Sequence, residues 1–331
     1  MQNKPTPTSH QEAQPLVSFI VTYYNLPMQM LCECIDSILA LSLRAYEREI
    51  IVVDDGSEVC PMNGLMQYAD DIVYVRQKNS GLSGARNLGI QMATGKYLQF
   101  VDGDDHLIQP AYEHCLDIVR YHEDADMVLF DFSRTEKAPN SYTTPNPVSG
   151  TEYMRHHNIH GTAWGFIFRR KTLGDLRFTS GIWHEDEEFT PQLLLRAEHV
   201  YPTDAKAYFY NQRPHSITSS ADEQSRAKRT DDRLGVIRRL RQLSDRMPHE
   251  DSLALQRRVA QLTMDHIYHC IMEERSIKAL NECIEQLRAE GLFPLPDRNY
   301  SQKYQWFRRL TATALGRHVL LNTLPLLRKE R

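Results

Sequence analysis

The sequence predicts an α/β fold in which a mostly parallel central sheet is followed by a helical C-terminal region. In the first two thirds of the chain, short apolar runs alternate with segments whose apolar residues recur at helical spacing, as in βαβ units. From residue 221 to residue 331 the patterns are helical. We therefore expect a largely parallel sheet covered by helices, with ligands bound at the carboxyl ends of its strands.

Five short apolar runs predict the strands of this sheet. They lie at residues 17–21, 49–53, 71–75, 97–101 and 127–132. Such runs are typical of parallel strands that are buried on both faces. Helices are expected to begin near Pro27, Ser83 and Pro110, and Gly95 is placed to cap the second of them. The first helix should bury one face, made of Leu31, Cys34, Ile35 and Ile38.

The later segments are less regular. Residues 133–158 are rich in Pro, Asn, Ser and Thr, which predicts a loop. Structure should resume at residues 163–169, with a helix after the acidic run of residues 185–188 and a strand at residues 207–210. The predicted organisation is a disordered arm at 1–15, an α/β domain at 16–220 and a helical region at 221–331.

Composition excludes several classes of protein. The 331 residues include 39 Lys and Arg against 43 Asp and Glu, so no global basic field is available to hold nucleic acid. No apolar run approaches the roughly 18 residues that would suggest a membrane span. The N-terminus lacks the pattern of a secretory signal. The six cysteines form no CxxC pair, so we expect reduced thiols in a cytoplasmic protein.

Carboxylates gather directly after two of the predicted strands. Asp54 and Asp55 follow the second strand, and Asp102, Asp104 and Asp105 follow the fourth. Clustered carboxylates repel one another, and a divalent cation relieves the repulsion; hard oxygen ligands suit Mg²⁺ or Mn²⁺ shared with a phosphate-bearing substrate. The alternative is that these aspartates only cap turns and helices.

Four other ligand-binding motifs do not fit the sequence, because required residues are missing at the required positions. His106 and Leu107 stand where a calcium loop needs a ligand and a glycine, and Tyr97 stands where a P-loop needs Ser or Thr. The first βα turn, residues 22–25, has no G-x-G-x-x-G. His184-Glu185 lacks the second histidine of a zinc protease helix.

Several segments together resemble glycosyltransferase family 2, which has the GT-A fold. They are VSFIVTYYN (17–25), VVDDGS (52–57), NSGLSGARNLG (79–89), GKY (95–97), FVDGDD (100–105) and Glu185-Asp186. They occur in the family's order and span residues 16–215. Each segment alone is weak evidence, but several in order are a specific signal. The α/β domain is therefore expected to be the catalytic domain.

The resemblance implies a role for each matching residue. Donor nucleotide binding falls to Thr22, Tyr24, Asp54, Asp55, Arg86 and Asp102, and metal binding falls to Asp104 and Asp105, with Mg²⁺ or Mn²⁺ as the ion. An aspartate that accepts from a uracil N–H would favour UDP-sugars. Asp186 is the expected base that takes the proton of the acceptor hydroxyl. The alternatives are a surface ion pair for Arg86 and a favourable charge at a helix start for Asp186.

Further residues are expected around the acceptor and the diphosphate. Trp164, Trp183, His184 and Glu185 are the acceptor-side candidates, because aromatic faces suit sugar rings. Each of the aromatic residues has core packing as its alternative. Arg213 and His215 resemble a loop that closes over the diphosphate in related enzymes, and a surface position is the alternative for His215.

The C-terminal segment is basic. Residues 301–331 hold seven basic residues and one acid, interleaved with Trp306, Phe307 and several leucines. Such a helix can lie on an anionic membrane surface, or it can pack on the catalytic domain with a solvated basic face.

The sequence thus predicts an inverting, metal-dependent hexosyl- or N-acetylhexosaminyl-transferase. Its partners would be a nucleotide-sugar donor, with UDP as the expected nucleotide, and a glycan or lipid-linked glycan acceptor of cell-surface polysaccharide synthesis. Its expected location is cytoplasmic, with peripheral contact to the cytoplasmic face of the membrane. A nucleotidyltransferase would need a glycine-rich basic loop that residues 22–27 lack. A catalytically silent sugar-nucleotide or glycan-binding module is the alternative from another class.

Overall fold

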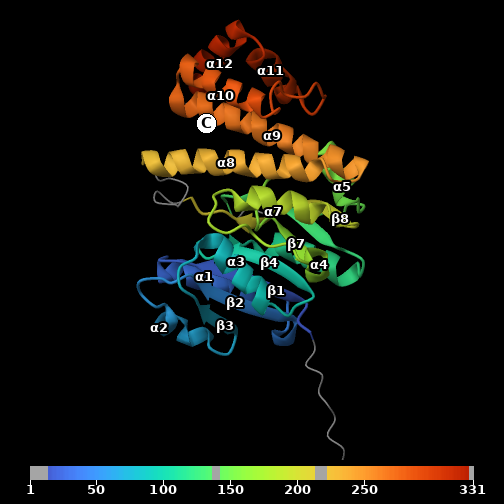
Figure 1. Cartoon of the computed structure of the whole chain (residues 1–331). Helices are drawn as coiled ribbons and strands as arrows, with labels where there is room; N and C mark the ends of the chain where they lie inside the picture. Colours follow the sequence, from blue (N-terminus) through green and yellow to red (C-terminus); the bar gives the residue numbers. More distant parts are fainter. Residues whose placement is uncertain (1–13, 136–141, 213–221, 328–331) are drawn as a thin grey trace, which may run out of the picture. The chain divides into compact units, whose positions relative to one another are not determined.

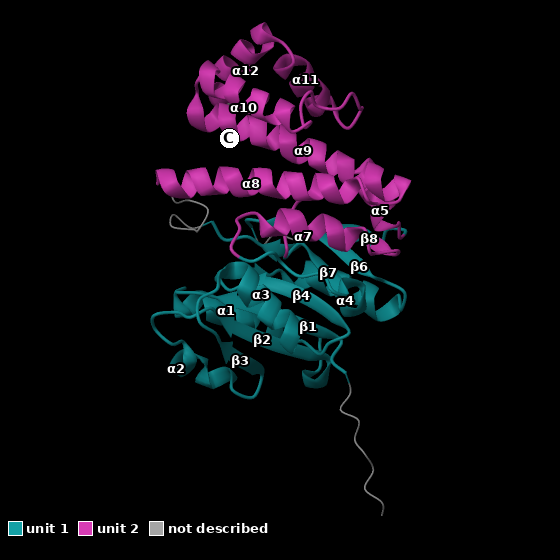
Figure 2. Ribbon diagram, viewed as in Figure 1, with its two compact units in different colours: residues 1–146, 164–180, 201–212 teal, residues 147–163, 181–200, 213–331 magenta. Residues whose placement is uncertain are grey.

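The computed structural model describes residues 14–135, 142–212 and 222–327, which divide into two compact units (Figure 2). The first unit comprises residues 1–146, 164–180 and 201–212, and the second comprises 147–163, 181–200 and 213–331. Segments from the middle of the chain thus belong to the second unit. The division at residue 220 into a catalytic domain and a helical region stays a prediction, because compactness does not show which segments act in catalysis.

The first unit is built on a sheet whose described strands number eight, in the order β3-β2-β1-β4-β7-β6-β8-β5 (Figure 1). The strands are β1 (Val17–Tyr23), β2 (Arg48–Asp54), β3 (Ile72–Arg76), β4 (Tyr97–Asp102), β5 (His106–Leu107), β6 (Met127–Ser133), β7 (Phe166–Arg169) and β8 (Val200–Phe209). The expected strands are confirmed as β1, β2, β3, β4 and β6, and β8 contains the strand expected at 207–210. β1 pairs in parallel with β2 and β4, and β2 with β3. The pairs β4–β7, β6–β7 and β5–β8 are antiparallel.

Burial on both faces explains the apolar runs. All seven residues of β1 are buried. Val17, Phe19 and Val21 share a core cluster with α1 (Met28–Leu39) and α4 (Gln109–Tyr121). Ile20 meets α3 (Gly81–Met92), where a Cβ on Gly89 would lie 2.2 Å from Ile20 Cγ2, so the glycine permits the close approach. The expected buried face of α1, made of Leu31, Cys34, Ile35 and Ile38, is confirmed.

Two local expectations are wrong. Gly95 does not cap α3, which ends at Met92 with Ala93 as its C-cap residue. The Gly95 N–H instead donates to Ser18 Oγ at 2.8 Å, and a Cβ there would lie 2.6 Å from that oxygen. The second error is in the loop expected at 133–158, which holds the helix α5 (Gly150–His156). Its N-cap Ser149 accepts from the Glu152 N–H at 3.1 Å, so the Ser-x-x-Glu spacing was the signal.

Short helices complete the first unit. They are α2 (Met62–Leu65), α6 (Arg170–Leu173) and two 3₁₀ turns, η1 (Ala45–Glu47) and η2 (Met66–Tyr68). Besides α5, the second unit contains α7 (Glu185–Leu194), α8 (Glu223–Ser244), α9 (His249–Glu274), α10 (Ile277–Ala289), α11 (Gln302–Thr311) and α12 (Ala314–Leu327). α9 contacts α5, α8, α10, α11 and α12, so it is the centre of this unit. The helical character expected after residue 221 is confirmed where the chain is described. None of the described helices combines the length and the apolar character that crossing a bilayer requires.

Candidate active site

The parallel strands end side by side, and their register brings the predicted carboxylates to one edge of the sheet. Tyr23 of β1 pairs with Asp54 of β2 on one side, and Thr22 pairs with Asp102 of β4 on the other. The Asp55 N–H donates to Tyr23 O at 2.9 Å, which continues the β1–β2 ladder past the strand end. The two acidic segments therefore flank the carboxyl end of β1, where open α/β sheets bind ligands.

Asp54 holds the turn that follows β2. Its side chain is fully buried; Oδ1 accepts from the Ser57 N–H at 2.8 Å and Oδ2 from the Tyr74 hydroxyl at 2.8 Å. Gly56 within this turn has φ 78°, and a Cβ there would lie 2.7 Å from the Asn79 nitrogen. The turn thus depends on both the carboxylate and the glycine.

Asp55 ties the same turn to the start of α3. Its Oδ1 accepts from Gln77 Nε2 at 2.6 Å and from the Ser80 N–H at 2.9 Å, while Oδ2 accepts from the Gly81 N–H at 2.8 Å. These backbone donors belong to the first turn of a helix, which lacks internal partners for them. Each carboxylate oxygen accepts about two hydrogen bonds, so Oδ2 keeps capacity for a ligand donor.

Arg86 and Asp102 form a partly buried ion pair at the carboxyl end of β4. Arg86 Nη2 lies 3.0 Å from Asp102 Oδ1, and Thr22 Oγ1 lies 3.4 Å from the same oxygen. The Arg86 side chain is 3 % exposed, and its guanidinium lies over the Phe178 ring at 5.4 Å. The structure therefore brings Thr22, Arg86 and Asp102 together, whereas Tyr24 is exposed at the surface.

Asp104 and Asp105 differ in environment although they are adjacent. Asp105 is 2 % exposed and accepts from the Asn211 N–H at 2.8 Å, while Asp104 is half-buried. Burial, followed by the charges of Asp102 and Asp104, raises the pKa of Asp105 to about 8. The Asn211 N–H and the Tyr208 hydroxyl oppose this rise. The edge therefore holds three neighbouring carboxyl groups, and their proximity disfavours the charged form of Asp105.

The donor set at this edge fits a hard divalent cation that the substrate helps to hold. Within the described ranges, no three His, Cys, Asp or Glu side chains are arranged to bind a metal ion. Mg²⁺ is commonly held by one or two carboxylates together with substrate phosphates rather than by a complete protein cage. Asp104 and Asp105 supply oxygen ligands of this kind.

The four acidic residues at the start of α7 have different contacts. Glu187 pairs with the buried Arg258 of α9, and Glu188 binds Arg239 of α8 through two contacts of 2.7 and 3.0 Å. Glu185 is buried, whereas Asp186 is half-buried and accepts from the Glu187 N–H at 2.9 Å. Two of the four acids thus anchor the helix inside the second unit.

His184 and Trp183 precede this helix. His184 has φ 64°, a conformation that non-glycine residues rarely adopt, and its buried Nε2 has no hydrogen-bond partner among the described residues. Burial, and then the charge of Arg233, lowers the pKa of His184 to about 4, so the ring is neutral at pH 7. The Trp183 N–H donates to Asp232 Oδ2 at 2.8 Å, and Arg229 lies over its ring.

Trp164 belongs to the hydrophobic core. It is 9 % exposed and stacks on Tyr208 with 4.3 Å between ring centroids. This packing favours the core alternative over an acceptor-side role. Arg213 and His215 lie outside the described residues.

Some supporting residues were not identified from the sequence. Tyr74 and Gln77 bind Asp54 and Asp55, and the Tyr208 hydroxyl accepts from the Asp102 N–H at 3.1 Å. Tyr208 is 106 residues from Asp102, and its local pattern predicts only a strand. The motif segment 79–89 was the only signal near Gln77.

Comparisons with known proteins agree with this geometry. Residues 18–177 match the family model described as Glycosyl transferase family 2. The chain is 32% identical over 223 residues to EpsJ of Bacillus subtilis, described as an uncharacterized glycosyltransferase, covering 62% of this chain and 63% of that one. It is 26% identical over 222 residues to GgaB of B. subtilis, a minor teichoic acid biosynthesis protein, covering 64% of this chain and 24% of that one. The chain thus spans less than two thirds of these relatives.

Solved structures are similar in fold. The crystal structure of S. aureus TarS residues 1–349 in complex with UDP-GlcNAc has a TM-score of 0.65 at 19% identity, covering 95% of this chain and 91% of that one. The mannosyltransferase PcManGT of Pyrobaculum calidifontis, in complex with GDP-Man and Mn²⁺, has a TM-score of 0.57 at 14% identity, covering 98% and 90%. Residues 18–177 of the chain thus match glycosyltransferase family 2, and the chain has the GT-A fold of these solved structures.

Proposed function

We propose that the protein is an inverting, metal-dependent glycosyltransferase that moves a sugar from a nucleotide-sugar donor to a glycan or lipid-linked glycan of a cell-surface polysaccharide. The observation that carries the proposal is the register of β1, β2 and β4, which puts the Asp54-Asp55 turn and the Asp102–Asp105 segment on either side of one strand end. This arrangement lies within the segment that matches the family model.

Donor binding is assigned to the carboxyl end of β1. Asp55 Oδ2, which retains acceptor capacity, would receive an N–H of the base, and Thr22, Tyr24 and Asp102 would contact base and ribose. Asp54 would act by holding the turn, and Arg86 by positioning Asp102. A UDP-sugar is the proposed donor, which is supported by the UDP-GlcNAc complex of TarS; the GDP-Man complex of PcManGT makes GDP-sugars the competing class.

The metal would be Mg²⁺ or Mn²⁺ held by Asp104 and Asp105, and PcManGT binds Mn²⁺. When bound, the ion would neutralise charge on the departing diphosphate. Asp186 would take the proton from the acceptor hydroxyl as this oxygen attacks the anomeric carbon from the face opposite the diphosphate. Such a displacement inverts the anomeric centre and needs no enzyme nucleophile. Trp183, His184 and Glu185 would border the acceptor.

Peripheral contact with the cytoplasmic face of the membrane is part of the proposal. Leu315, Val319 and Leu326 of α12 are exposed and share one helix face, because their spacings are four and seven residues. Trp306 of α11 is 65% exposed; α11 carries Arg308 and Arg309, and α12 carries Arg317. Exposed apolar residues combined with basic residues bind anionic lipid surfaces and would bring the enzyme to lipid-linked acceptors.

The test is a donor panel with matched variants. The purified chain is mixed with Mn²⁺ or Mg²⁺ and with UDP-, GDP- and dTDP-sugars, and thermal shift and nucleoside diphosphate release are measured. One UDP-sugar should stabilise the protein only with metal, and Asp104→Ala should abolish this shift. Asp186→Ala should keep the shift but lower turnover by about 100-fold or more.

Asp70→Ala is the control, because Asp70 is an exposed aspartate outside the site. Its thermal shift and turnover should equal those of the wild type. Failure of every nucleotide sugar to bind in the presence of metal, or full turnover by Asp186→Ala, would contradict the proposal.

A further inference from the structure

A cavity in the first unit is lined by cations. Its volume is about 520 Å³, within the range of small-molecule sites. The lining residues are Gln14, Ile90, Lys96, Arg169, Arg170, Lys171, Leu173, Gly174 and Arg177. Five of them are basic and none is acidic, so the cavity concentrates positive charge in a chain whose formal net charge is −4.

This cavity is separate from the candidate active site. Tyr97 begins β4 and pairs with Arg169 at the end of β7, so the cavity lies at the amino ends of the parallel strands. Asp102 ends the same strand at the carboxyl edge. At about 3.3 Å per residue, Lys96 and Asp102 are roughly 20 Å apart. A ligand of one site therefore does not contact the other.

Most of the cations in the cavity form no ion pair with the described residues. Arg169 is the exception, because its Nε lies 3.2 Å from Asp126 Oδ1. Arg170 Nε donates to Gly95 O at 3.0 Å, and Arg177 Nη1 donates to Gly174 O at 3.1 Å. These two bonds orient the guanidinium groups but leave their charges uncompensated.

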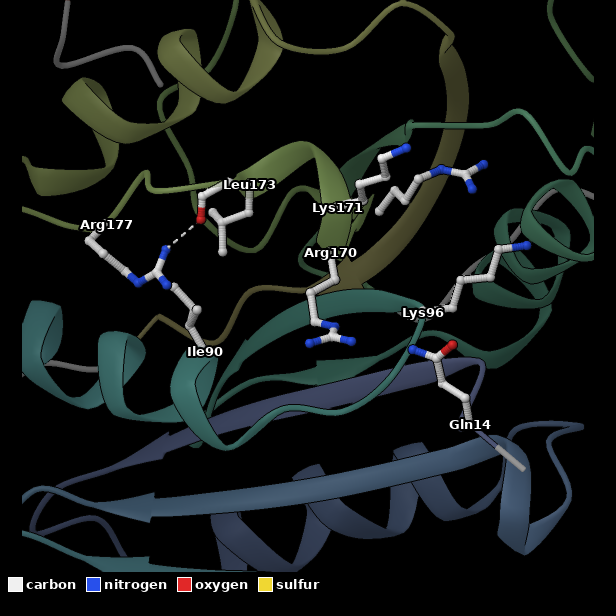
Figure 3. A pocket seen from close by; sticks show the side chains of 9 residues that line it. Gln14, Ile90, Lys96, Arg170, Lys171, Leu173 and Arg177 are labelled. Atoms are coloured by element: carbon white, nitrogen blue, oxygen red, sulfur yellow. Dashed lines mark hydrogen bonds between the residues drawn. The ribbon is translucent and has the colours of Figure 1, made fainter. Parts of the chain in front are cut away.

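The two lysines also have no acidic partner in residues 14–135, 142–212 and 222–327. Lys96 Nζ lies 5.5 Å from the centre of the Tyr97 ring, and Lys171 makes no hydrogen bond or ion pair with the part of the chain that the structure describes. Figure 3 shows Arg177 and Lys96 on opposite sides of the cavity with Arg170 between them. The cations are thus spread along the cavity instead of meeting at one point.

We propose that this cavity binds a small anion that carries more than one phosphate group. Arginine forks and lysine ammonium groups are the side chains that recognise phosphate oxygens. Four of the cations have no acidic partner among the described residues, and neutralising them requires more negative charge than one carboxylate supplies. The apolar part of the lining is limited to Ile90, Leu173 and the stems of the long side chains, which suits a polar ligand. Free oligophosphates and phosphate-bearing lipid headgroups share this chemistry.

The experiment measures pyrophosphate binding to the full chain by titration calorimetry in the presence of a metal chelator. Lys171→Glu should weaken binding by about tenfold or more, because Lys171 contributes charge and no described structural contact. Lys278→Glu is the matched control; this side chain is 84% exposed on α10, and its variant should bind within about twofold of the wild type. Asp104→Ala should bind pyrophosphate as the wild type does.

A second arm uses vesicles with an anionic phospholipid and measures co-sedimentation of the same variants. Loss of pyrophosphate binding in Lys171→Glu supports the proposal with a soluble ligand, and loss of vesicle binding in Lys171→Glu but not in Lys278→Glu supports it with a headgroup. The proposal is overturned if neither probe binds the wild type up to about 10 mM phosphate. It is also overturned if Lys171→Glu and Lys278→Glu bind both probes with equal affinity. A third contradicting result is that Asp104→Ala no longer binds pyrophosphate while Lys171→Glu still does.

Discussion

The Asp55 carboxylate illustrates how one residue satisfies two demands. Its oxygens accept from Gln77 and from the backbone N–H groups of Ser80 and Gly81, so it caps α3 whether or not a donor is bound. From the sequence, one alternative role of this aspartate was to cap a turn or a helix. The hydrogen bonds of Asp55 are those of such a cap. An inactive Asp55 variant would not by itself prove donor binding, because it would also loosen the start of α3.

His184 leads to a prediction about pH. Burial lowers its pKa to about 4, aided by Arg233, His269 and Arg229 and opposed by Asp232. The unfolded chain then binds more protons than the folded one between pH 4 and 6.5, so this contribution to stability is present above pH 6.5 and is lost as pH falls. Between pH 7 and 5, the wild type should lose about 2 kcal/mol more unfolding free energy than His184→Asn.

Urea unfolding at the two pH values measures this difference. Asn is the chosen replacement because it tolerates the left-handed conformation at φ 64° and does not titrate. His157→Asn is the control, because this histidine is exposed on the surface. Equal pH dependence of the wild type and His184→Asn would show that His184 is not held neutral by burial.

At the level of elements, α7 is held by two ion pairs of unequal burial. The Arg258 side chain is 4% exposed, pairs with Glu187 and donates to Ile159 O at 2.7 Å, whereas Arg239 is 41% exposed. Arg258→Met leaves a carboxylate and a buried carbonyl without a partner and should cost about 3 kcal/mol of unfolding free energy. Arg239→Met should cost about 1 kcal/mol or less, because water solvates Glu188 in its place.

Urea unfolding of both variants, monitored by far-ultraviolet circular dichroism, tests whether Arg258→Met loses more unfolding free energy than Arg239→Met. The double variant Glu187→Gln with Arg258→Met should recover part of the loss, because it removes the unpaired charge. Equal losses for the two single variants, or no recovery in the double variant, would show that α7 is not anchored through Arg258.

The elements that were predictable have local signals. β1, β2 and β4 are apolar runs buried on both faces, and α1 shows its buried stripe in the sequence. β5 has only two residues and exists through its pairing with β8, about 100 residues later, so no local pattern marks it. Gly95 was misassigned for a similar reason: its contact with Ser18 spans 77 residues. The carboxylate edge was predictable because motif residues sit at strand ends, whereas Tyr74 and Tyr208 support it from other strands.

Over the whole molecule, charge and apolar surface are unevenly distributed. The formal net charge is −4, yet residues 301–331 hold seven basic residues and one acid. In the same segment, Leu315 is 77% exposed and Leu326 is 65% exposed on one face of α12. Exposed leucines beside basic residues are the combination that binds anionic lipid surfaces, where apolar insertion and charge attraction add.

This distribution predicts that the full chain binds vesicles of anionic phospholipid and that α12 carries the contact. Leu315→Ser combined with Leu326→Ser should lower the partition coefficient by about tenfold or more, since each change removes an inserting side chain. Val59→Ser combined with Met66→Ser is the matched control, because these exposed apolar residues, 79% and 65% exposed, lie in the first unit. Co-sedimentation with vesicles at two salt concentrations measures the effect, and binding should weaken at high salt because charge attraction is screened. If both double variants bind equally, α12 does not carry the contact, and packing within the protein becomes the better explanation for its basic and apolar composition.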